Sequence, residues 1–597
     1  MKKFSTLILS LLMGLNVFAQ NQVLKAIPSA EVKNFKVAET QLKQQSSAKA
    51  KVRNYVESEA FYTTYDFQSN SYLGNRMYQL NDGSVGVVAT MSNEEYDGSF
   101  PDRGTGYNFY KEGNIDASNA IPQVREEANA TGEDVRTGWP SIAPYGAEGE
   151  ILVNHNGNGL LYYTRAKAGE GVWDGPYAIP NPDGMALTWA RIVTTGTNNN
   201  TVHIFAAANG NDELVYQYYL RSENLNGWDI QFSPLEMDNL HINCYAADDY
   251  VVSANGNNIA VVYCNGFSEH VMIYISHDAG LTWESRMIWE CPVVYIEDEW
   301  RDESNEDFLY EDLFGPTHAS VAIGNDGVAH VALGVGLYAL KPGGYYSLYY
   351  GSITDGIAYW NSSYETALRS PQDDDLRNAL RLWWPDPEQE GYMTLDFTNF
   401  CALTPPHPEE GYFEASKQYT GSEGSAGDYL MSFGVSAYPA IAVDPAGNLA
   451  IAYSAPDVNR DEVYYDRYGN PYYYRSIFVN YKPVDSAVWG QVPVLIPTNM
   501  YSASAHSQSE CTFVSAVSTP KNVNEFWFSC MTDDTPGFHT GVTGASQDHI
   551  TTGTINVFKF TPTEEYEVED PLPEEPENYW NPDPSLYANN MTVITTI

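Results

Sequence analysis

The stretch that decides the fold is residues 276–283, which read Ser-His-Asp-Ala-Gly-Leu-Thr-Trp. A run of β-branched and aromatic residues typical of a strand, Val271-Met-Ile-Tyr-Ile275, precedes it. Asp278 can accept hydrogen bonds from the amides of its own turn, and Gly280 can adopt a positive φ. We therefore expect a tight turn between two outer strands, with Trp283 packed between sheets.

Trp283 is the third of three tryptophans with a fixed spacing. Trp173 and Trp228 are 55 residues apart, and Trp228 and Trp283 are also 55 apart. Each tryptophan ends the same series of a small-residue strand, a turn, a β-branched strand, a polar loop and a Tyr-rich strand. A repeat of this length with four short strands predicts one blade of a β-propeller.

Looser copies of this unit lie on both sides of the regular ones. Seven four-stranded antiparallel blades are predicted; six is the alternative, if the first and last copies share a blade. Pairing the ends of such a ring removes exposed sheet edges. We expect an all-β chain with a single propeller over residues 58–562. The looser copies span residues 83–110, 319–360, 439–489 and 511–560.

Two insertions interrupt the repeat. Residues 297–312 are densely acidic, and residues 361–436 form a long insertion whose residues 373–382 show the period of a helix. Long insertions between repeats usually lie on one face and often shape a binding surface.

The two ends of the chain have different compositions. Residues 1–19 resemble a secretory signal peptide, with Lys2 and Lys3 before an apolar run and a cleavage site ending at Ala19. This predicts export to the periplasm, the outer surface or the extracellular medium. Residues 20–57 are expected to form a basic flexible arm. Residues 563–597 are expected to form an acidic, Pro-rich linker followed by a strand.

The charge of the chain excludes some partners. The formal net charge is −46, which repels phosphate backbones, so we expect no nucleic acid partner. No later run approaches the roughly 20 apolar residues of a spanning helix, so no transmembrane helix is expected. The sequence leaves the oligomeric state open.

The cysteines bear on disulfides and metals. The six cysteines include no C-x-x-C pair, which argues against a zinc site. Cys511 and Cys530 are expected to form a disulfide between neighbouring strands. No cofactor is predicted. Oxygen-rich loops at residues 248–249, 297–312 and 373–375 leave calcium as an alternative, although none has EF-hand spacing.

Residues 276–283 fit the pattern Ser-x-Asp-x-Gly-x-Thr-Trp and resemble the Asp-box, or BNR, repeat of sialidase-like propellers. The motif occurs in sialidases, other glycoside hydrolases, lectin-like modules and non-catalytic propellers, so it argues for fold more than function. A sialidase would also need an arginine triad and a Tyr-Glu pair, but the typical Arg-Ile-Pro segment is absent and Arg76 is the nearest arginine in position. The resemblance implies a scaffold role for Ser276, Asp278, Gly280, Thr282 and Trp283.

Propeller geometry points to a different set of candidate ligand-binding residues. The first strand of each blade lines the central channel, and its start lies at the mouth. Arginine, histidine, aromatic and glutamate side chains there suit a carbohydrate or carboxylate. The alternative is that these groups cap strand ends; three of them are histidines, which would also suit a metal. The set is Arg136, Trp139, Trp189, Arg191, His241, His318, Tyr438, His506 and Glu510.

Three functions are consistent with these features. The first is an exported or cell-surface, non-catalytic propeller that binds glycan or protein. The second is a sialidase-like exo-glycoside hydrolase, and the third is a structural component of a surface or secretion-associated complex. A cluster of three arginines with a Tyr-Glu pair at the channel mouth would favour the second over the first.

Overall fold

The computed structural model describes residues 55–562 with internal gaps, of which the longest are 116–135, 235–248, 291–309, 370–399, 403–435, 497–509 and 535–551. The predicted signal peptide, most of the basic arm, the helical segment at 373–382 and the C-terminal linker and strand lie outside the described residues. In the described part of the chain, no helix is long and apolar enough to cross a membrane.

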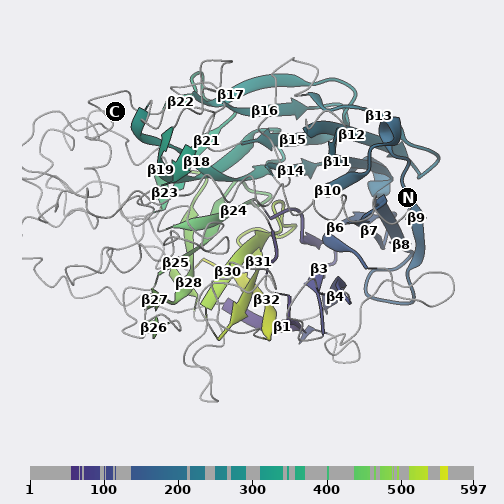
Figure 1. Ribbon diagram of the computed structural model, residues 1–597, viewed down its shortest axis with the longest axis horizontal. Helices are drawn as coiled ribbons and strands as arrows, with labels where there is room; N and C mark the ends of the chain where they lie inside the picture. The colour runs from purple at the N-terminus through teal and green to yellow at the C-terminus, as the bar shows by residue number, and fades with distance from the viewer. Residues whose placement is uncertain are drawn as a thin grey trace, which may run out of the picture.

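The chain forms a seven-bladed, all-β propeller (Figure 1). Each blade is a four-stranded antiparallel path, with short additional strands on blades 4 and 5. From the channel outward, blade 1 holds β2 (Met77–Gln79), β3 (Val85–Met91), β4 (Gly104–Lys111) and β5 (Asn114–Ile115). Blade 2 holds β6 (Gly138–Tyr145), β7 (Gly149–Asn156), β8 (Gly159–Arg165) and β9 (Asp174–Ala178). Blade 3 holds β10 (Leu187–Thr195), β11 (Thr201–Asn209), β12 (Val215–Glu223) and β13 (Asp229–Phe232).

Blades 4 to 6 follow the same order. Blade 4 holds β14 (Tyr250–Asn255), β15 (Asn258–Tyr263), β16 (Val271–Ser276) and β17 (Glu284–Glu290), with β22 (Leu368–Arg369) parallel to β17. Blade 5 holds β18 (Tyr310–Ile323), β19 (Ala329–Leu340), β21 (Ile357–Asn361) and β23 (Phe400–Ala402), with β20 (Tyr346–Leu348) on β19. Blade 6 holds β24 (Ala437–Val443), β25 (Leu449–Pro456), β28 (Arg475–Lys482) and β29 (Val494–Ile496), beside a hairpin of β26 (Val463–Tyr465) and β27 (Pro471–Tyr473). Two short 3-10 helices, η3 (Pro182–Gly184) and η4 (Thr197–Asn199), flank β10.

Blade 7 closes the ring with both ends of the propeller. Its strands are β30 (Glu510–Ala516), β31 (Phe526–Asp533), β32 (Gly553–Phe560) and β1 (Tyr55–Thr63). β1 pairs antiparallel with β32, from Tyr55 opposite Phe560 to Thr63 opposite Gly553. The first sequence repeat therefore builds blade 1 alone, and the segment before it completes blade 7. This arrangement resolves the count at seven rather than six.

Burial follows the position of a strand within its blade. β3 (VGVVATM) and β24 (AYPAIAV) are buried at every position because neighbouring blades cover both faces. Small and β-branched side chains suit this narrow space. The outermost strands β9 and β13 have no fully buried residue.

The turn at residues 276–283 joins β16 to β17, as its sequence predicts. The Asp278 carboxylate accepts hydrogen bonds from the Leu281 and Thr282 amides at 3.1 and 2.8 Å and from the Thr282 hydroxyl at 2.7 Å. These bonds lower the pKa of Asp278 to about 2. Gly280 has a φ of +79°, and Trp283 packs edge-on against Tyr219 of blade 3.

Two further predictions can be compared with the structure. The predicted Cys511–Cys530 disulfide is wrong: both cysteines are buried and form no disulfide, and Cys511 lies opposite Thr532, which places Cys530 two residues away along β31. The acidic insertion is shorter than predicted at its end, because β18 already begins at Tyr310.

Candidate functional site

The inner strands share one irregularity. Blades 2, 3, 5, 6 and 7 each have a register shift near the start of the inner strand, where a β-bulge adds residues to that strand. An aromatic side chain or a histidine occupies each bulge. We call these five residues the mouth ring: Trp139, Trp189, His318, Tyr438 and Phe513.

Four members of the mouth ring have a strained backbone. Their φ values are 49° for Trp139, 51° for Trp189, 53° for Tyr438 and 52° for Phe513. Bulky residues rarely adopt this left-handed conformation, which costs about 1 to 3 kcal/mol at each position and clusters at functional sites. The repetition of the same strain in four blades marks this end of the channel as the candidate site.

The mouth ring belongs to one cluster of packed side chains. His318 and Tyr438 lie with ring centroids 4.6 Å apart, and Tyr438 and Phe513 are 5.2 Å apart. Trp139 shares a buried cluster with Tyr438 and Phe513, and Trp189 packs against that cluster. Blades that are distant in sequence therefore contribute to one largely buried cluster.

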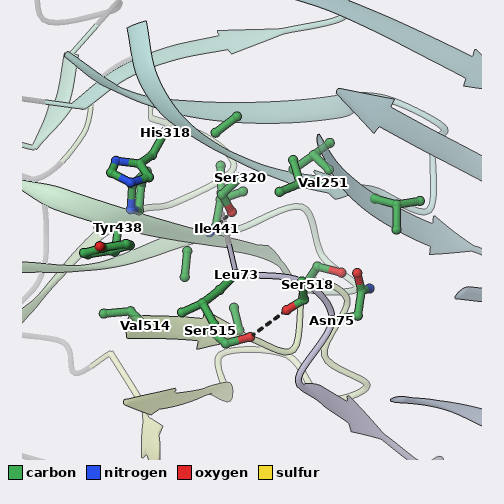
Figure 2. Close-up of a pocket in the computed structure, with 17 residues that line it drawn as sticks. Leu73, Asn75, Val251, His318, Ser320, Tyr438, Ile441, Val514, Ser515 and Ser518 are labelled. Atoms are coloured by element: carbon green, nitrogen blue, oxygen red, sulfur yellow. Dashed lines mark hydrogen bonds between the residues drawn. The ribbon is translucent and has the colours of Figure 1, made fainter. Parts of the chain in front are cut away.

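A small cavity adjoins the ring (Figure 2). His318 and Tyr438 lie at one side of it, and residues of the inner strands together with Leu73, Gly74 and Asn75 line the rest. The polar atoms near its wall are hydrogen-bonded: the hydroxyls of Ser253 and Ser518 are 2.9 Å apart, and Ser515 donates to the Gly74 carbonyl at 3.4 Å.

Arginines gather around His155 on the blade 1 to 3 side of the mouth. The Arg103 guanidinium lies over the ring of Trp139, 4.7 Å from its centroid, and donates to the Thr137 carbonyl at 2.9 Å. Arg76 is buried and donates to the carbonyls of Pro140 and Gln68 at 2.7 and 2.8 Å. We call the group of Arg76, Arg103, Arg136 and Arg191 the arginine group.

His155 is the uncharged centre of this group. Its ring stacks on Trp139 with centroids 5.4 Å apart, and its Nδ1 accepts a hydrogen bond from the Trp189 amide at 3.2 Å. Burial lowers the pKa of His155 to about 3, and all four members of the arginine group add to the shift, with Arg103 the largest contributor. Because His155 is neutral at pH 7, the positive charge here belongs to the guanidinium groups.

A second polar group occupies the blade 5 to 7 side. Arg475 is buried and donates to the hydroxyl and carbonyl of Ser454 at 3.1 and 3.0 Å. Burial, and then Arg475, lower the pKa of His318 to about 3. Burial raises the pKa of Tyr438, an effect that Arg475 opposes and Glu510 strengthens. Both rings are therefore uncharged at neutral pH.

The structure divides the sequence-predicted residues between these two sides. Arg136, Trp139, Trp189 and Arg191 belong to the blade 1 to 3 side, and His318, Tyr438 and Glu510 to the other. His241 and His506 lie outside the described residues, so the three-histidine metal hypothesis stays untested. Within the described ranges, no three His, Cys, Asp or Glu side chains lie close enough to hold a metal.

Sequence reasoning missed His155 and Arg103. Neither begins an inner strand: His155 ends β7, and Arg103 precedes β4. The signal that would have found His155 is strand register, because it lies opposite Gly138 on β6, next to Trp139. Arg76, singled out only for its position, joins the group as well.

Comparisons with known proteins add the following. No protein-family model and no curated protein matches the chain. Among solved structures, a protein of unknown function from Dyadobacter fermentans is 8% identical, with 85% of this chain and 100% of that chain covered and a TM-score of 0.32. An α-L-arabinofuranosidase from Fusarium graminearum is 11% identical, with 85% and 98% covered and a TM-score of 0.34. A Hadza microbial sialidase is 11% identical, with 46% and 56% covered and a TM-score of 0.25. These values are too low to transfer a function.

Proposed function

We propose that this chain is an exported, non-catalytic propeller that binds an acidic glycan at the channel mouth. The observation that carries the proposal is the convergence of the arginine group on neutral His155, beside the rings of Trp139 and Trp189. Guanidinium groups bind carboxylates in two-point geometry, and the half-buried ring of Trp189 suits the apolar face of a sugar.

The exposure of the arginines distinguishes those that are accessible to a ligand from those that support the site. Arg136 is exposed and Arg103 is half-buried, so both are accessible to a ligand. Arg76 and Arg191 are 3% and 1% exposed and hold neighbouring backbone in place while adding to the local field. This concentration of positive charge in a chain of net charge −46 favours an acidic ligand locally.

The protonation states favour binding over hydrolysis. A general acid or base works best with a pKa near the working pH, whereas the pKa values of His155 and His318 are lowered to about 3. The Tyr438 phenol is buried with a raised pKa, which opposes its use as a nucleophile. The proposal therefore assigns the described groups to recognition.

The test is calorimetric titration of the full mature chain with sialyllactose, oligogalacturonate and neutral lactose. We expect the acidic ligands to bind, with affinity falling as salt rises, and lactose to bind at least about tenfold more weakly. Arg103→Gln should weaken acidic-ligand binding about tenfold or more. Arg221→Gln is the matched control, because Arg221 lies beside the turn at Ala279 on another blade.

Two outcomes would contradict the proposal. One is that folded protein binds none of the acidic ligands, or binds them equally well after Arg103→Gln. The other is release of the fluorophore from a fluorogenic sialoside, with that activity lost in Tyr438→Phe, which would favour the hydrolase alternative.

A further inference from the structure

A second aromatic site lies far from the mouth, at the outer edge between blades 2 and 3. The outer strands β8, β9, β12 and β13 follow one edge of the ring (Figure 1). They and the turn before β13 carry six aromatic side chains on the faces that the two blades turn toward each other. We call these the rim cluster: Tyr162, Tyr177, Tyr216, Tyr218, Trp228 and Phe232.

The rings of the rim cluster form two adjoining groups. Tyr162 contacts Tyr177 of its own blade with centroids 5.2 Å apart, and contacts Trp228 of blade 3 at 5.8 Å. On blade 3, Phe232 stacks on Tyr218 at 5.2 Å and lies 6.2 Å from Tyr216. Tyr162, Tyr216 and Trp228 all pack against the one apolar cluster between the blades, which joins the two groups.

Two rings of the rim cluster are exposed to solvent, whereas the rings at the interface between blades 3 and 4 are buried beneath Trp283. Tyr177 is 42% exposed and Phe232 is 45% exposed, and no other aromatic residue in the described ranges is among the exposed large apolar side chains. Between blades 3 and 4, Trp283 packs edge-on over Phe205 and Tyr219, both fully buried. The inter-blade core therefore does not require exposed rings, and their exposure here points to a ligand.

The polar groups beside these rings define the kind of ligand. Asp174 is exposed, accepts a hydrogen bond from the Tyr177 hydroxyl at 2.8 Å and lies near Tyr162. Asp229, also exposed, follows Trp228 directly. Carboxylates repel an acidic ligand and accept hydrogen bonds from hydroxyl groups, while flat apolar rings stack on the C–H face of a sugar.

We propose that the rim cluster is a second saccharide site, which binds a neutral oligosaccharide. It differs in charge and position from the mouth, where arginines select an acidic ligand. The inference does not rest on the proposed function of the mouth, since no residue is common to the two sites. Two sites of different selectivity on one propeller would let it hold a mixed glycan at two points.

The experiment uses the full mature chain in affinity gels that contain neutral β-1,4-linked glucan, xylan or mannan, followed by calorimetry with the corresponding hexasaccharides. We expect at least one neutral polysaccharide to retard the protein. Tyr177→Ala and Phe232→Ala should each weaken hexasaccharide binding about tenfold, because each substitution removes the apolar contact area of one ring. Both side chains are exposed, so the variants are expected to fold.

Control variants distinguish binding at this site from binding at the mouth and from non-specific apolar adsorption. Leu281→Ala removes a side chain that is 67% exposed on blade 4, and should bind like the parent. Arg103→Gln should also leave neutral binding unchanged, whatever its effect on acidic ligands. The assignment is wrong if no neutral polysaccharide binds, if Tyr177→Ala and Phe232→Ala bind normally, or if the two variants instead lose binding only to an apolar peptide.

Discussion

Arg191 of blade 3 lies directly on the backbone of Gly74, which precedes the inner strand of blade 1. A Cβ on Gly74 would be 2.5 Å from Nε of Arg191 and 2.9 Å from Cζ. The Arg191 side chain therefore occupies space that only a glycine at position 74 leaves free. Position 74 controls the geometry of the mouth although it contributes no side chain.

Gly74→Ala is therefore expected to displace Arg191. We predict weaker binding of the acidic ligand and a loss of about 1 to 3 kcal/mol in the free energy of unfolding, typical of an overpacked interior. Calorimetry and urea denaturation measure the two effects. Gly157→Ala is the control, because a Cβ at Gly157 meets nothing within 4 Å; equal effects in both variants would refute the prediction.

Glu150→Gln is expected to destabilise the interface of blades 1 and 2. The fully buried Glu150 carboxylate pairs with Arg165 at 2.9 Å and accepts hydrogen bonds from the hydroxyls of Tyr78 and Tyr107 and from the Gly169 amide. Removing its charge leaves the Arg165 guanidinium buried without its counter-ion, which costs about 3 to 5 kcal/mol.

Thermal and urea denaturation of Glu150→Gln test that cost. The matched control is Glu170→Gln, which breaks the exposed ion pair between Glu170 and Lys167 and should leave the midpoint unchanged. A midpoint shift in Glu150→Gln no larger than that of the control would show that the buried pair is dispensable.

Buried neutral histidines predict a loss of stability in mild acid. Burial lowers the pKa of His203 to about 3 and that of His330 to about 4, as it does for His155 and His318. The unfolded chain binds these protons below about pH 6.5 and the folded chain does not, so stability is full above that pH and falls as the pH drops toward 4.

Each such histidine contributes a slope of about 1.4 kcal/mol per pH unit in that window. Urea unfolding at pH 7, 6 and 5 measures the sum. His330→Gln should reduce the slope by about the contribution of one histidine. An unchanged slope in His330→Gln would contradict the prediction.

Ring closure predicts a sharp boundary for truncation. A chain that begins at residue 54 keeps β1, whereas one that begins at residue 64 leaves β32 as an open edge strand in blade 7. We expect the first to retain the thermal midpoint of the mature chain. The second should lose stability and aggregate, because an unpaired edge recruits other strands. Differential scanning calorimetry and light scattering distinguish them; a stable, monomeric second truncation would contradict this account.

The blade repeat was predictable because its physical cause is local. Alternating strand and turn chemistry follows from pairing within one blade. The even spacing of Trp173, Trp228 and Trp283 follows from a contact with the preceding blade that is repeated in successive units. The pairing of β1 with β32 joins residues at opposite ends of the propeller, so no local pattern indicates it. The missing disulfide between Cys511 and Cys530 has the same cause, since a disulfide depends on register as well as on neighbouring strands.

The candidate site was predictable only in part. The repeated order of strands indicates where the inner strand of each blade begins, which predicts Trp139, Trp189 and His318 at the mouth. His155 lies at the end of a second strand and reaches Trp139 across the ladder. Its role depends on tertiary geometry, and the same is true of the space that Gly74 leaves for Arg191.

At the β-bulges of the inner strands, the backbone conformation is repeated but the side chain differs from blade to blade. Five blades offer nearly the same backbone position, yet they carry tryptophan twice, histidine, tyrosine and phenylalanine there. A change of side chain at one bulge also affects its neighbours, because the ring of His318 packs on Tyr438 and that of Tyr438 packs on Phe513. A change of specificity at the mouth therefore involves several blades at once.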